Sequence, residues 1–335
     1  MGALDLAILL AIAYAFTNGL HDAANSIATL VATRAARPGP AVLLAAAGNI
    51  LGPVLFGAAV ADVVAGIVQV PASEEVAIVG AALSAAVVWN LVTWKLGIPS
   101  SSGHALVGGL AGAAIAADGI HAVNWGPLDG WKPSGVGGVL LALAIAPVAG
   151  FVAGWLLERI LRRVFARATD EVRGPVRASQ WVVSGVVAFG HGANDGQKAV
   201  GLIAAMLLAT GHISSLSAPT WAALACGVAL TMGTALGGWP IVKTVGRRIF
   251  RLRPADSLAS QGGSAAVLIV STAVGAPVST TQIVASSVVG AGSGRRRVHH
   301  IHWPVVREIL VAWLVTLPVC ALLAAGAQAI WRWFA

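Results

Sequence analysis

Residues 18–28, N-G-L-H-D-A-A-N-S-I-A, and residues 191–201, H-G-A-N-D-G-Q-K-A-V-G, are two polar runs inside apolar stretches of membrane-spanning length. When Asp22 is placed over Asp195, the two runs align residue by residue. An ionisable residue in the middle of an apolar span is costly and marks a functional position. A matched pair of such residues therefore predicts a site shared by two copies of one unit.

A second pair of runs repeats downstream of the first pair, in the same order. G-I-P-S-S-S-G-H at 97–104 matches G-A-P-V-S-T-T-Q at 275–282. Duplicated polar interruptions of hydrophobic helices are typical of secondary transporters built from repeats, with the binding site where the repeats meet. The four runs together predict such a protein.

The composition indicates a polytopic membrane protein before any motif is considered. Hydrophobic residues make up 57% of the 335 residues and charged residues only 10%, and the mean hydropathy is +0.83. A soluble domain carries about 25% charged residues. The chain is therefore predicted to be an all-α polytopic membrane protein whose solvent is the lipid bilayer.

The net charge of +8 is gathered in a few hydrophilic segments. Most of the 21 Lys and Arg residues fall at 34–37, 159–177, 243–253 and 295–307. The positive-inside rule places such segments in the cytoplasm. The charge thus reports topology, and no nucleic-acid partner is expected. We expect a multi-pass protein of the cytoplasmic membrane with both termini on the extracytoplasmic side.

The same rule orders the spans into two halves. Each half is expected to contain three crossings and one re-entrant hairpin, and this odd number of passes gives the halves opposite orientations. The expected crossings are 4–33, 41–70, 135–157, 179–210, 219–245 and 304–330, and the hairpins are 76–118 and 262–294. The resulting divisions are a first transmembrane repeat at 1–157, an Arg-rich cytoplasmic linker at 158–178 and a second, inverted repeat at 179–335.

Each polar run is expected to break its helix. A continuous helix over 4–33 would be about 45 Å long, and Asn18-Gly19 supplies a place for a break. Free N–H groups of the half-helices, near Ala23 to Asn25 and near Gly196 to Lys198, would then face the interior with positive dipole ends. The hydroxyls of the two hairpin tips would join them in a cage of neutral donors for an oxyanion.

The paired carboxylates suggest ion coupling. A carboxylate beside an anion is repulsive unless it is protonated or shares a cation. Asp22 and Asp195 are therefore expected to couple transport to a cation, although capping of the half-helices is an alternative role. His21 and His191 are candidate proton relays, with packing of a neutral imidazole as the alternative.

The four runs together resemble the inorganic phosphate transporter family, the Pit group, over nearly the whole chain. The resemblance implies inverted-topology repeats with broken helices and re-entrant hairpins, phosphate bound between them, and uptake driven by a cation gradient. It assigns phosphate binding to nine residues, namely Asp22, Asn25, Ser101, Ser102, Asn194, Asp195, Ser279, Thr280 and Thr281.

The chain departs from the sodium-coupled pattern G-A-N-D-V-A-N of this family in both halves. His21 replaces Asn in the first run, and Gly196-Gln197-Lys198 replaces Val-Ala-Asn in the second. These departures resemble the bacterial proton-linked branch. Lys198 stands where the repeat has Asn25, and we expect its ammonium to act as a built-in cation, with snorkelling to an interface as the alternative.

The sequence thus predicts a secondary transporter that imports inorganic phosphate by proton symport, with a metal–phosphate complex as another form of the substrate. Alternatives are a permease for sulfate or another tetrahedral oxyanion and a sodium-coupled phosphate symporter. An intramembrane hydrolase using Ser102 with His104 or His191 is a remote alternative. No cofactor beyond the coupling ion is expected, no metal site is assigned, and a homo-oligomer is compatible with the sequence.

Overall fold

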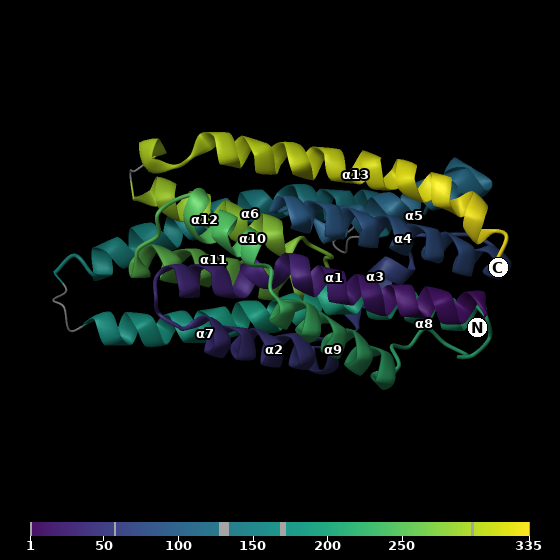
Figure 1. Cartoon of the computed structure of the whole chain (residues 1–335), viewed down its shortest axis with the longest axis horizontal. Helices are drawn as coiled ribbons and strands as arrows, with labels where there is room; N and C mark the ends of the chain where they lie inside the picture. The colour runs from purple at the N-terminus through teal and green to yellow at the C-terminus, as the bar shows by residue number, and fades with distance from the viewer. Residues whose placement is uncertain (1, 57, 127–133, 168–171, 296–297, 335) are drawn as a thin grey trace.

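The computed structural model describes residues 2–56, 58–126, 134–167, 172–295 and 298–334, and these residues are almost entirely helical (Figure 1). Within these ranges the only β pairing is an isolated antiparallel bridge between Val68 and Val123. The prediction of an all-α membrane protein is confirmed. The expected linker and the last basic segment are described in part, because residues 168–171 and 296–297 lie outside these ranges.

The described residues of the first half form six α-helices. They are α1 (Ala3–Ala32), α2 (Pro38–Leu55), α3 (Ala59–Ala65), α4 (Ala72–Leu96), α5 (Ser102–Asp118) and α6 (Gly135–Val164), with a short 3-10 turn, η1 (Ile120–Ala122), after α5.

The second half repeats this pattern with more irregular helices. It contains α7 (Arg173–His191), the π-helical turn η3 (Gly192–Gly196), α8 (Gln197–Ala209), α9 (Thr220–Leu236), α10 (Trp239–Lys243), a second π-helical turn η4 (Thr244–Arg248), α11 (Pro254–Ala273), α12 (Thr280–Gly294), the 3-10 turn η5 (Val298–His300) and α13 (Trp303–Trp331).

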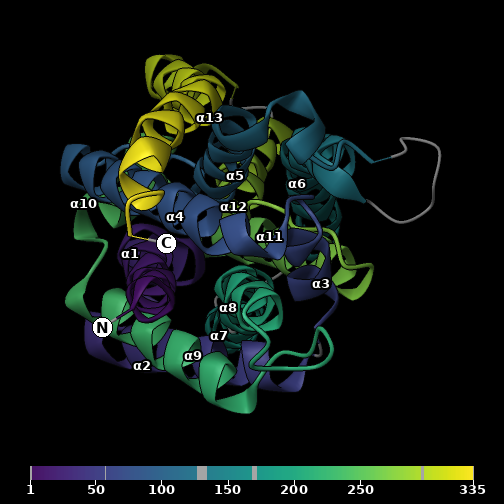
Figure 2. The same cartoon turned by 90° about the vertical axis from the view of Figure 1, so that its right-hand side faces the viewer.

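Five helices of the described ranges are long and apolar enough to cross a bilayer, namely α1, α2, α4, α6 and α13. A sixth span results if α9 is joined to the segment Trp239–Arg248, which is bent by 62° from it. Seen from the end that carries the termini (Figure 2), α1 lies between α4 and α9, and both helices contact it. The chain thus places its first helix in the interior of the bundle.

Two helical hairpins, α4 with α5 and α11 with α12, enter the bundle from opposite ends (Figure 1). Arg332, near the C-terminus, contacts both Glu74 at the start of α4 and the carbonyl oxygen of Ala117 at the end of α5. Arg295 at the end of α12 contacts Asp256 at the start of α11. Each hairpin therefore begins and ends on one side, as predicted for re-entrant segments. With 15 residues, α12 is about 22 Å long, too short for a hydrocarbon core of about 30 Å.

The tips of the hairpins follow from their sequence. Gly97 (φ 67°) and Gly275 (φ 75°) end the first arm of each hairpin in the left-handed region, which favours glycine. Ser101 and Ser279 then cap the second arms, because each side-chain hydroxyl accepts a hydrogen bond from a backbone N–H three residues later. The duplicated Gly-Pro-Ser pattern thus encodes a duplicated turn.

The expected break at Asn18-Gly19 is wrong, because α1 is one continuous helix. Gly19 instead allows close packing, since a Cβ there would collide with the backbone of Leu230 in α9. In the second half the matching position is the π-helical turn η3, which keeps the chain helical between α7 and α8. The expected half-helix N-termini near Asn25 and Lys198 are therefore absent from these continuous helices, and side chains must supply the donors there.

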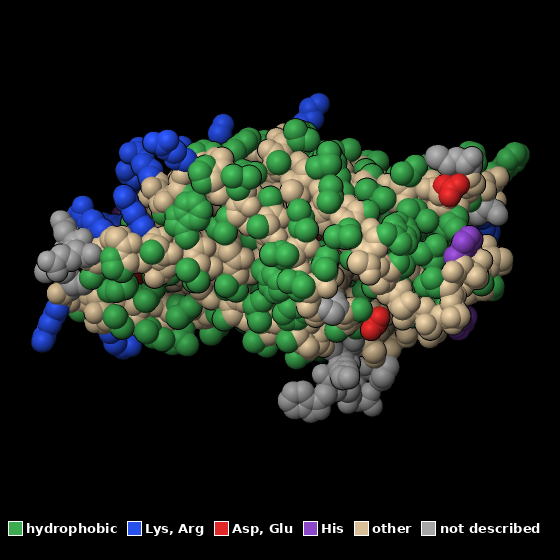
Figure 3. Space-filling model, turned by 90° about the horizontal axis from the view of Figure 1, so that it is seen from below, with side chains coloured by type: hydrophobic (Ala, Val, Ile, Leu, Met, Phe, Trp, Pro, Cys, Tyr) green, Lys and Arg blue, Asp and Glu red, His purple; other side chains and the backbone are tan. Residues whose placement is uncertain are grey.

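The two ends of the bundle differ in charge. Both termini lie at one end (Figure 1), and Lys and Arg side chains gather at the opposite end (Figure 3). Helix α1 runs away from the terminus end, whereas α7 and α8 run toward it. The corresponding helices of the two halves thus have opposite directions, as expected for inverted repeats.

Cysteine labelling can check which end faces outward. Ser73→Cys places an exposed thiol at the terminus end, and Arg163→Cys places one at the Arg-rich end. A membrane-impermeant thiol reagent added to intact cells should modify the first and spare the second, because Cys226 and Cys320 are buried and supply little background. Modification of the Arg163 variant alone would reverse the proposed orientation.

Glycines set the distance between several helices. A Cβ at Gly112 of α5 would collide with the backbone of Ala321 in α13, and one at Gly233 of α9 would collide with Phe16 in α1. Small residues at such crossings let backbones approach closely, which is the main source of helix association in a bilayer.

A pair of alanine substitutions tests this packing. Gly112→Ala should destabilise the protein by about 1–3 kcal/mol through overpacking. Gly326→Ala, on α13 with no neighbouring atom within 4 Å of the new Cβ, should leave stability equal or slightly higher, because alanine favours helix. Thermal melting of the two purified variants in one detergent makes the comparison, and equal melting temperatures would contradict the packing role of Gly112.

Candidate functional site

Two buried carboxylates from different halves of the chain share one imidazole. Asp22 on α1 and Asp195 in η3 have exposed fractions of 3% and 1%. Nε2 of His191 lies 3.9 Å from Oδ2 of Asp22 and 3.6 Å from Oδ2 of Asp195. Its Nδ1 lies 2.9 Å from Oδ1 of Asn49 on α2, whereas Nε2 has no hydrogen-bond partner. The repeat therefore brings its two aspartates together around His191.

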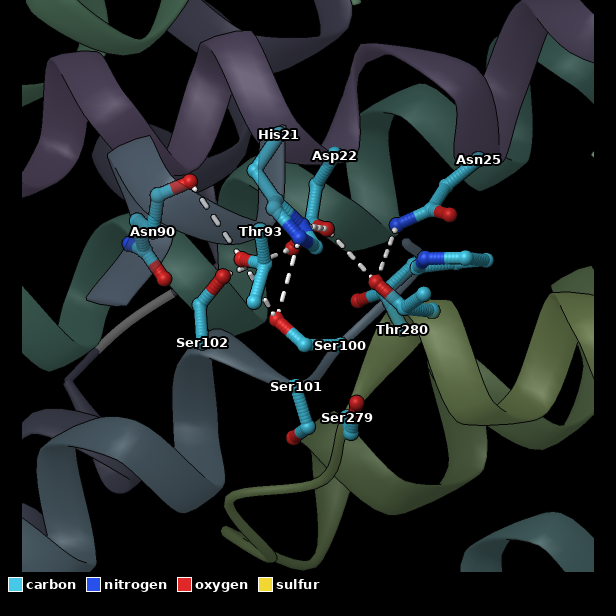
Figure 4. Close-up of polar contacts among 12 residues, drawn as sticks. His21, Asp22, Asn25, Asn90, Thr93, Ser100, Ser101, Ser102, Ser279 and Thr280 are labelled. Atoms are coloured by element: carbon cyan, nitrogen blue, oxygen red, sulfur yellow. Dashed lines mark hydrogen bonds and ion pairs between the residues drawn. The ribbon is translucent and has the colours of Figure 1, made fainter. Parts of the chain in front are cut away.

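The Asp22 carboxylate is surrounded by polar side chains of α1 and of both hairpin tips (Figure 4). Nδ1 of His21 lies 2.8 Å from Oδ1. Thr281 donates a hydrogen bond to the same oxygen, and Ser102 donates one of 3.4 Å to Oδ2. Ser102 and Thr281 lie in the first turns of α5 and α12. Asp22 is thus the point at which the two hairpins meet α1.

A hydrogen-bonded chain leads away from Asp22 through His21 (Figure 4). Nε2 of His21 lies 3.1 Å from the hydroxyl of Ser100, which donates a 3.0 Å hydrogen bond to Thr93. All four side chains are buried, and His21 is 0% exposed. The arrangement connects the carboxylate to α4 through groups that can each accept and donate a hydrogen bond.

The Asp195 carboxylate is held by a fixed cation instead. Nζ of Lys198 donates to Oδ1 of Asp195 and to the carbonyl oxygen of Val278, both at 2.6 Å. Thr280 donates to the other carboxylate oxygen. Lys198 is 1% exposed, so the alternative of snorkelling to an interface is wrong. Gly103 leaves room for the ammonium, since a Cβ there would lie 3.3 Å from Nζ.

The two asparagines of the runs lie beside the carboxylates but differ in their partners. Nδ2 of Asn25 donates to Thr281 at 3.1 Å. Nδ2 of Asn194 donates to Thr272 at 3.1 Å and to the carbonyl oxygen of Ala276 at 3.0 Å. Both side-chain oxygens lack a partner. Asn194 thus braces the end of α11, whereas Asn25 lies against the tip of the second hairpin.

The two remaining predicted residues are engaged as helix caps. The hydroxyl of Ser101 accepts from the backbone N–H of His104 at 3.1 Å and lies 2.7 Å from Nδ1 of the same residue. The hydroxyl of Ser279 accepts from the backbone N–H of Gln282 at 3.4 Å. Both are buried at the hairpin tips.

Sequence reasoning missed Asn49 and Thr93 as parts of this site. Asn49 orients His191 and also donates to Thr234 at 2.9 Å, and Thr93 ends the chain from His21. Neither lies in a duplicated run. The only signal was a polar side chain in an apolar span, which more often serves helix packing.

The site combines donors for an anion with acceptors for a cation. The hydroxyls, the imidazoles and the Lys198 ammonium can donate to oxyanion oxygens. Among the described residues, one group has donor atoms suited to a metal ion, namely Asp22, His191 and Asp195, whose ligand atoms lie within 4.8 Å of one another. With neutral imidazoles the two carboxylates and one ammonium leave the site with a net charge of about −1.

Comparison with known proteins agrees with this architecture. The sequence profile of the phosphate transporter family matches residues 18–177 and again residues 166–324, so the family pattern occurs twice along the chain. A solved structure described as the sodium-dependent phosphate transporter has the same fold, with a TM-score of 0.87, 24% identity and coverage of 100% of both chains.

Relatives of similar length give the same assignment. A probable low-affinity inorganic phosphate transporter of Bacillus subtilis is 39% identical over 96% of this chain and 94% of its own length. A protein of Rhizobium meliloti with the same description is 40% identical over 95% of this chain and 93% of its own length. These relatives are transporters, so the alternative of an intramembrane hydrolase is rejected. The chain belongs to the phosphate transporter family.

Proposed function

We propose that this protein imports inorganic phosphate across the cytoplasmic membrane as a proton symporter. The observation that supports the proposal best is the pair of buried aspartates, one from each half, enclosed by hydroxyl, imidazole and ammonium donors. The names of the relatives support phosphate as the substrate. The proposed mechanism needs no resident cofactor.

The carboxylates favour phosphate over sulfate. Phosphate keeps a proton near neutral pH and can donate it to an ionised carboxylate, whereas sulfate has none to donate. Asp22 and Asp195 would accept such hydrogen bonds, and Asn25, Ser102, Thr280 and Thr281 would serve the other oxygens. A site for sulfate would gain nothing from two carboxylates.

The charge balance favours protons as the coupling ion. An anion entering a buried site that already carries about −1 is repelled unless positive charge enters with it. His21 contacts Asp22, and His191 lies between both carboxylates. Imidazole is the usual proton-exchanging side chain of proteins. We propose that Asp22 with His21 carries the coupling proton and that Ser100 and Thr93 relay it.

Lys198 argues against a sodium ion at Asp195. Its ammonium contacts one carboxylate oxygen and one carbonyl oxygen, and oxygen atoms of these two kinds also coordinate hard cations. Because the Lys198 ammonium is attached to the chain in this place, a mobile cation is not needed to neutralise Asp195. The structural neighbour is named as sodium-dependent, but its identity of 24% supports the fold alone.

The proposed transporter consists of the two repeats and the linker that the sequence predicts. Residues 1–157 and 179–335 each supply one aspartate and one hairpin tip, and the Arg-rich segment 158–178 connects them on the cytoplasmic side. Both termini are then extracytoplasmic. In this arrangement the two halves enclose the anion between them, and rocking of one half against the other would expose it to either side.

Transport by purified protein in proteoliposomes tests the proposal. Labelled phosphate should accumulate when an inward proton gradient is imposed and should not accumulate with a sodium gradient alone. Excess sulfate should compete weakly. Uptake driven only by sodium would contradict proton coupling.

The same vesicles separate free phosphate from a metal–phosphate complex. The complex is the alternative to test because Asp22, His191 and Asp195 could together hold a metal ion. Removing divalent metal with EDTA should leave uptake unchanged if free phosphate is carried. Restoration of uptake by Mg²⁺ would establish the complex as the substrate.

Asp22→Asn should reduce proton-driven uptake at least about tenfold, because each lost hydrogen bond to a buried charge is worth about 1.5–3 kcal/mol. The amide keeps the size of the side chain but cannot take up a proton. Asp62→Asn, on the exposed surface of α3, is the matched control and should transport normally. Wild-type accumulation by the Asp22 variant would remove Asp22 from the coupling mechanism.

Lys198→Gln should also abolish concentrative uptake, because it leaves Asp195 buried without its cation. Lys198→Arg should not restore uptake, since the larger fork does not fit beside Gly103. The double variant Asp195→Asn/Lys198→Gln removes both charges. Thermal melting shows whether this double variant folds. If the folded double variant still fails to transport, Asp195 and Lys198 act in transport beyond neutralising each other. If uptake recovers, the role of the pair is structural.

A further inference from the structure

A polar cavity, separate from the central site, lies at the end of the bundle opposite the termini. Its volume is about 850 Å³, and it is bounded by the end of α6 and the starts of α7 and α11, with Arg295 just after α12. This is the end at which Lys and Arg side chains gather (Figure 3). None of the residues that form the central site lines this cavity.

Five arginines, two of them on α7, converge on this cavity, and they are Arg162, Arg173, Arg177, Arg253 and Arg295. Of the described residues that line the cavity, two are acidic, Glu158 and Asp256. Asp256 is already engaged, because both its oxygens accept from Nη1 of Arg295, at 2.9 and 2.8 Å, and one accepts from the backbone N–H of Arg253. The lining therefore carries a positive excess.

Three of these guanidinium groups form no salt bridge with a described acidic residue, and Glu158 is near enough to affect Arg162 electrostatically. Arg162, Arg177 and Arg253 are exposed, and within the described ranges none of them forms an ion pair. Arranging like charges around one hollow is unfavourable unless an anion joins them. Topology alone requires arginines at this end of the protein, but it does not require them to face a common cavity.

The chemistry of the lining identifies the class of ligand. The planar guanidinium fork matches two phosphate oxygens at once. Apolar side chains, Leu161, Phe165 and Val176, line the same cavity and would contact a less polar part of the ligand. The volume lies within the range of about 300–1,000 Å³ typical of small-molecule sites. Basic pockets between membrane helices are known acceptors of phosphorylated headgroups.

We propose that this Arg-lined cavity binds a phosphate-bearing anion at the Arg-rich end of the protein, separate from the central site. The shared chemistry fits two sources, the headgroup of an anionic phospholipid and a soluble phosphate ester. The proposal rests on the cavity and its charges and is independent of the transport mechanism.

Binding measurements on the full-length protein in phosphatidylcholine nanodiscs distinguish the two sources. In one arm, phosphatidylglycerol is included and native mass spectrometry counts the retained anionic lipids. In the other arm, ATP and inorganic tripolyphosphate are titrated by calorimetry at about 0.15 M salt, at which exposed charges are screened beyond about 8 Å. Saturable binding in the first arm identifies a lipid, and saturable binding in the second identifies a soluble ester.

Matched variants localise the binding. Arg162→Gln/Arg177→Gln/Arg253→Gln should weaken it at least about tenfold, that is by about 1.4 kcal/mol. The control Arg163→Gln/Arg167→Gln/Arg251→Gln removes the same charge from exposed arginines at the same end that do not line the cavity, and it should bind within about twofold of wild type. Replacement of the three lining arginines by lysine should weaken binding to an intermediate degree, because charge remains but the fork is lost.

All variants touch exposed side chains, and equal melting temperatures will show that they fold. Absence of saturable binding in both arms would overturn the proposal. An equal loss in the control variant would also overturn it, because binding would then reflect the general positive charge of this end.

Discussion

The structure depends on burying two carboxylates without leaving either unpaired. Removing an ionised carboxylate from water costs several kcal/mol unless hydrogen bonds and opposite charge replace the water. Asp22 and Asp195 obtain these partners from α1, η3, α8 and the tips of both hairpins. The hairpins must therefore stay docked while the carboxylates are ionised. A change in the charge of the site changes how strongly both tips are held.

The two halves satisfy this constraint with different chemistry. In the second half Lys198 neutralises Asp195 from one turn along the same helix. In the first half the position that matches Lys198 is Asn25, which donates a hydrogen bond to Thr281 and brings no charge. The hydrogen-bond partners of Asp22 are therefore His21 and hydroxyl groups. The partner of Asp195 is an ammonium at 2.6 Å, whereas the nitrogen partner of Asp22 is the imidazole of His21 at 2.8 Å. The duplicated site thus has matching positions in the two halves but different partners for its two carboxylates.

The sequence predicted the parts of this site that are encoded locally. The two hairpin tips follow from Gly97 and Gly275 with the capping serines, and the meeting of Asp22 with Asp195 follows from the duplication. The break at Asn18-Gly19 was predicted wrongly, because a glycine in an apolar helix signals flexibility and close packing equally well, and only the position of Leu230 in α9 decides between them. Asn49 and Thr93 could not be assigned for the same reason. Their roles depend on which neighbour each helix face meets, and this register is fixed by packing across the whole bundle.

The hairpin tip of the first half is held from two sides by interactions of different kinds. On its inner side Ser102 contacts the Asp22 carboxylate and Ser100 contacts His21. On its outer side neutral hydrogen bonds bind its backbone, from Thr244 to the carbonyl oxygen of Gly97 at 3.1 Å and from Trp313 to that of Pro99 at 2.9 Å. The inner contacts involve an ionisable carboxylate and an imidazole, whereas Thr244 and Trp313 are neutral. Thr244 begins η4, in the segment bent by 62° from α9, and α9 packs against α1. Asp22 is therefore connected through the tip of the first hairpin to a bent segment of the opposite half.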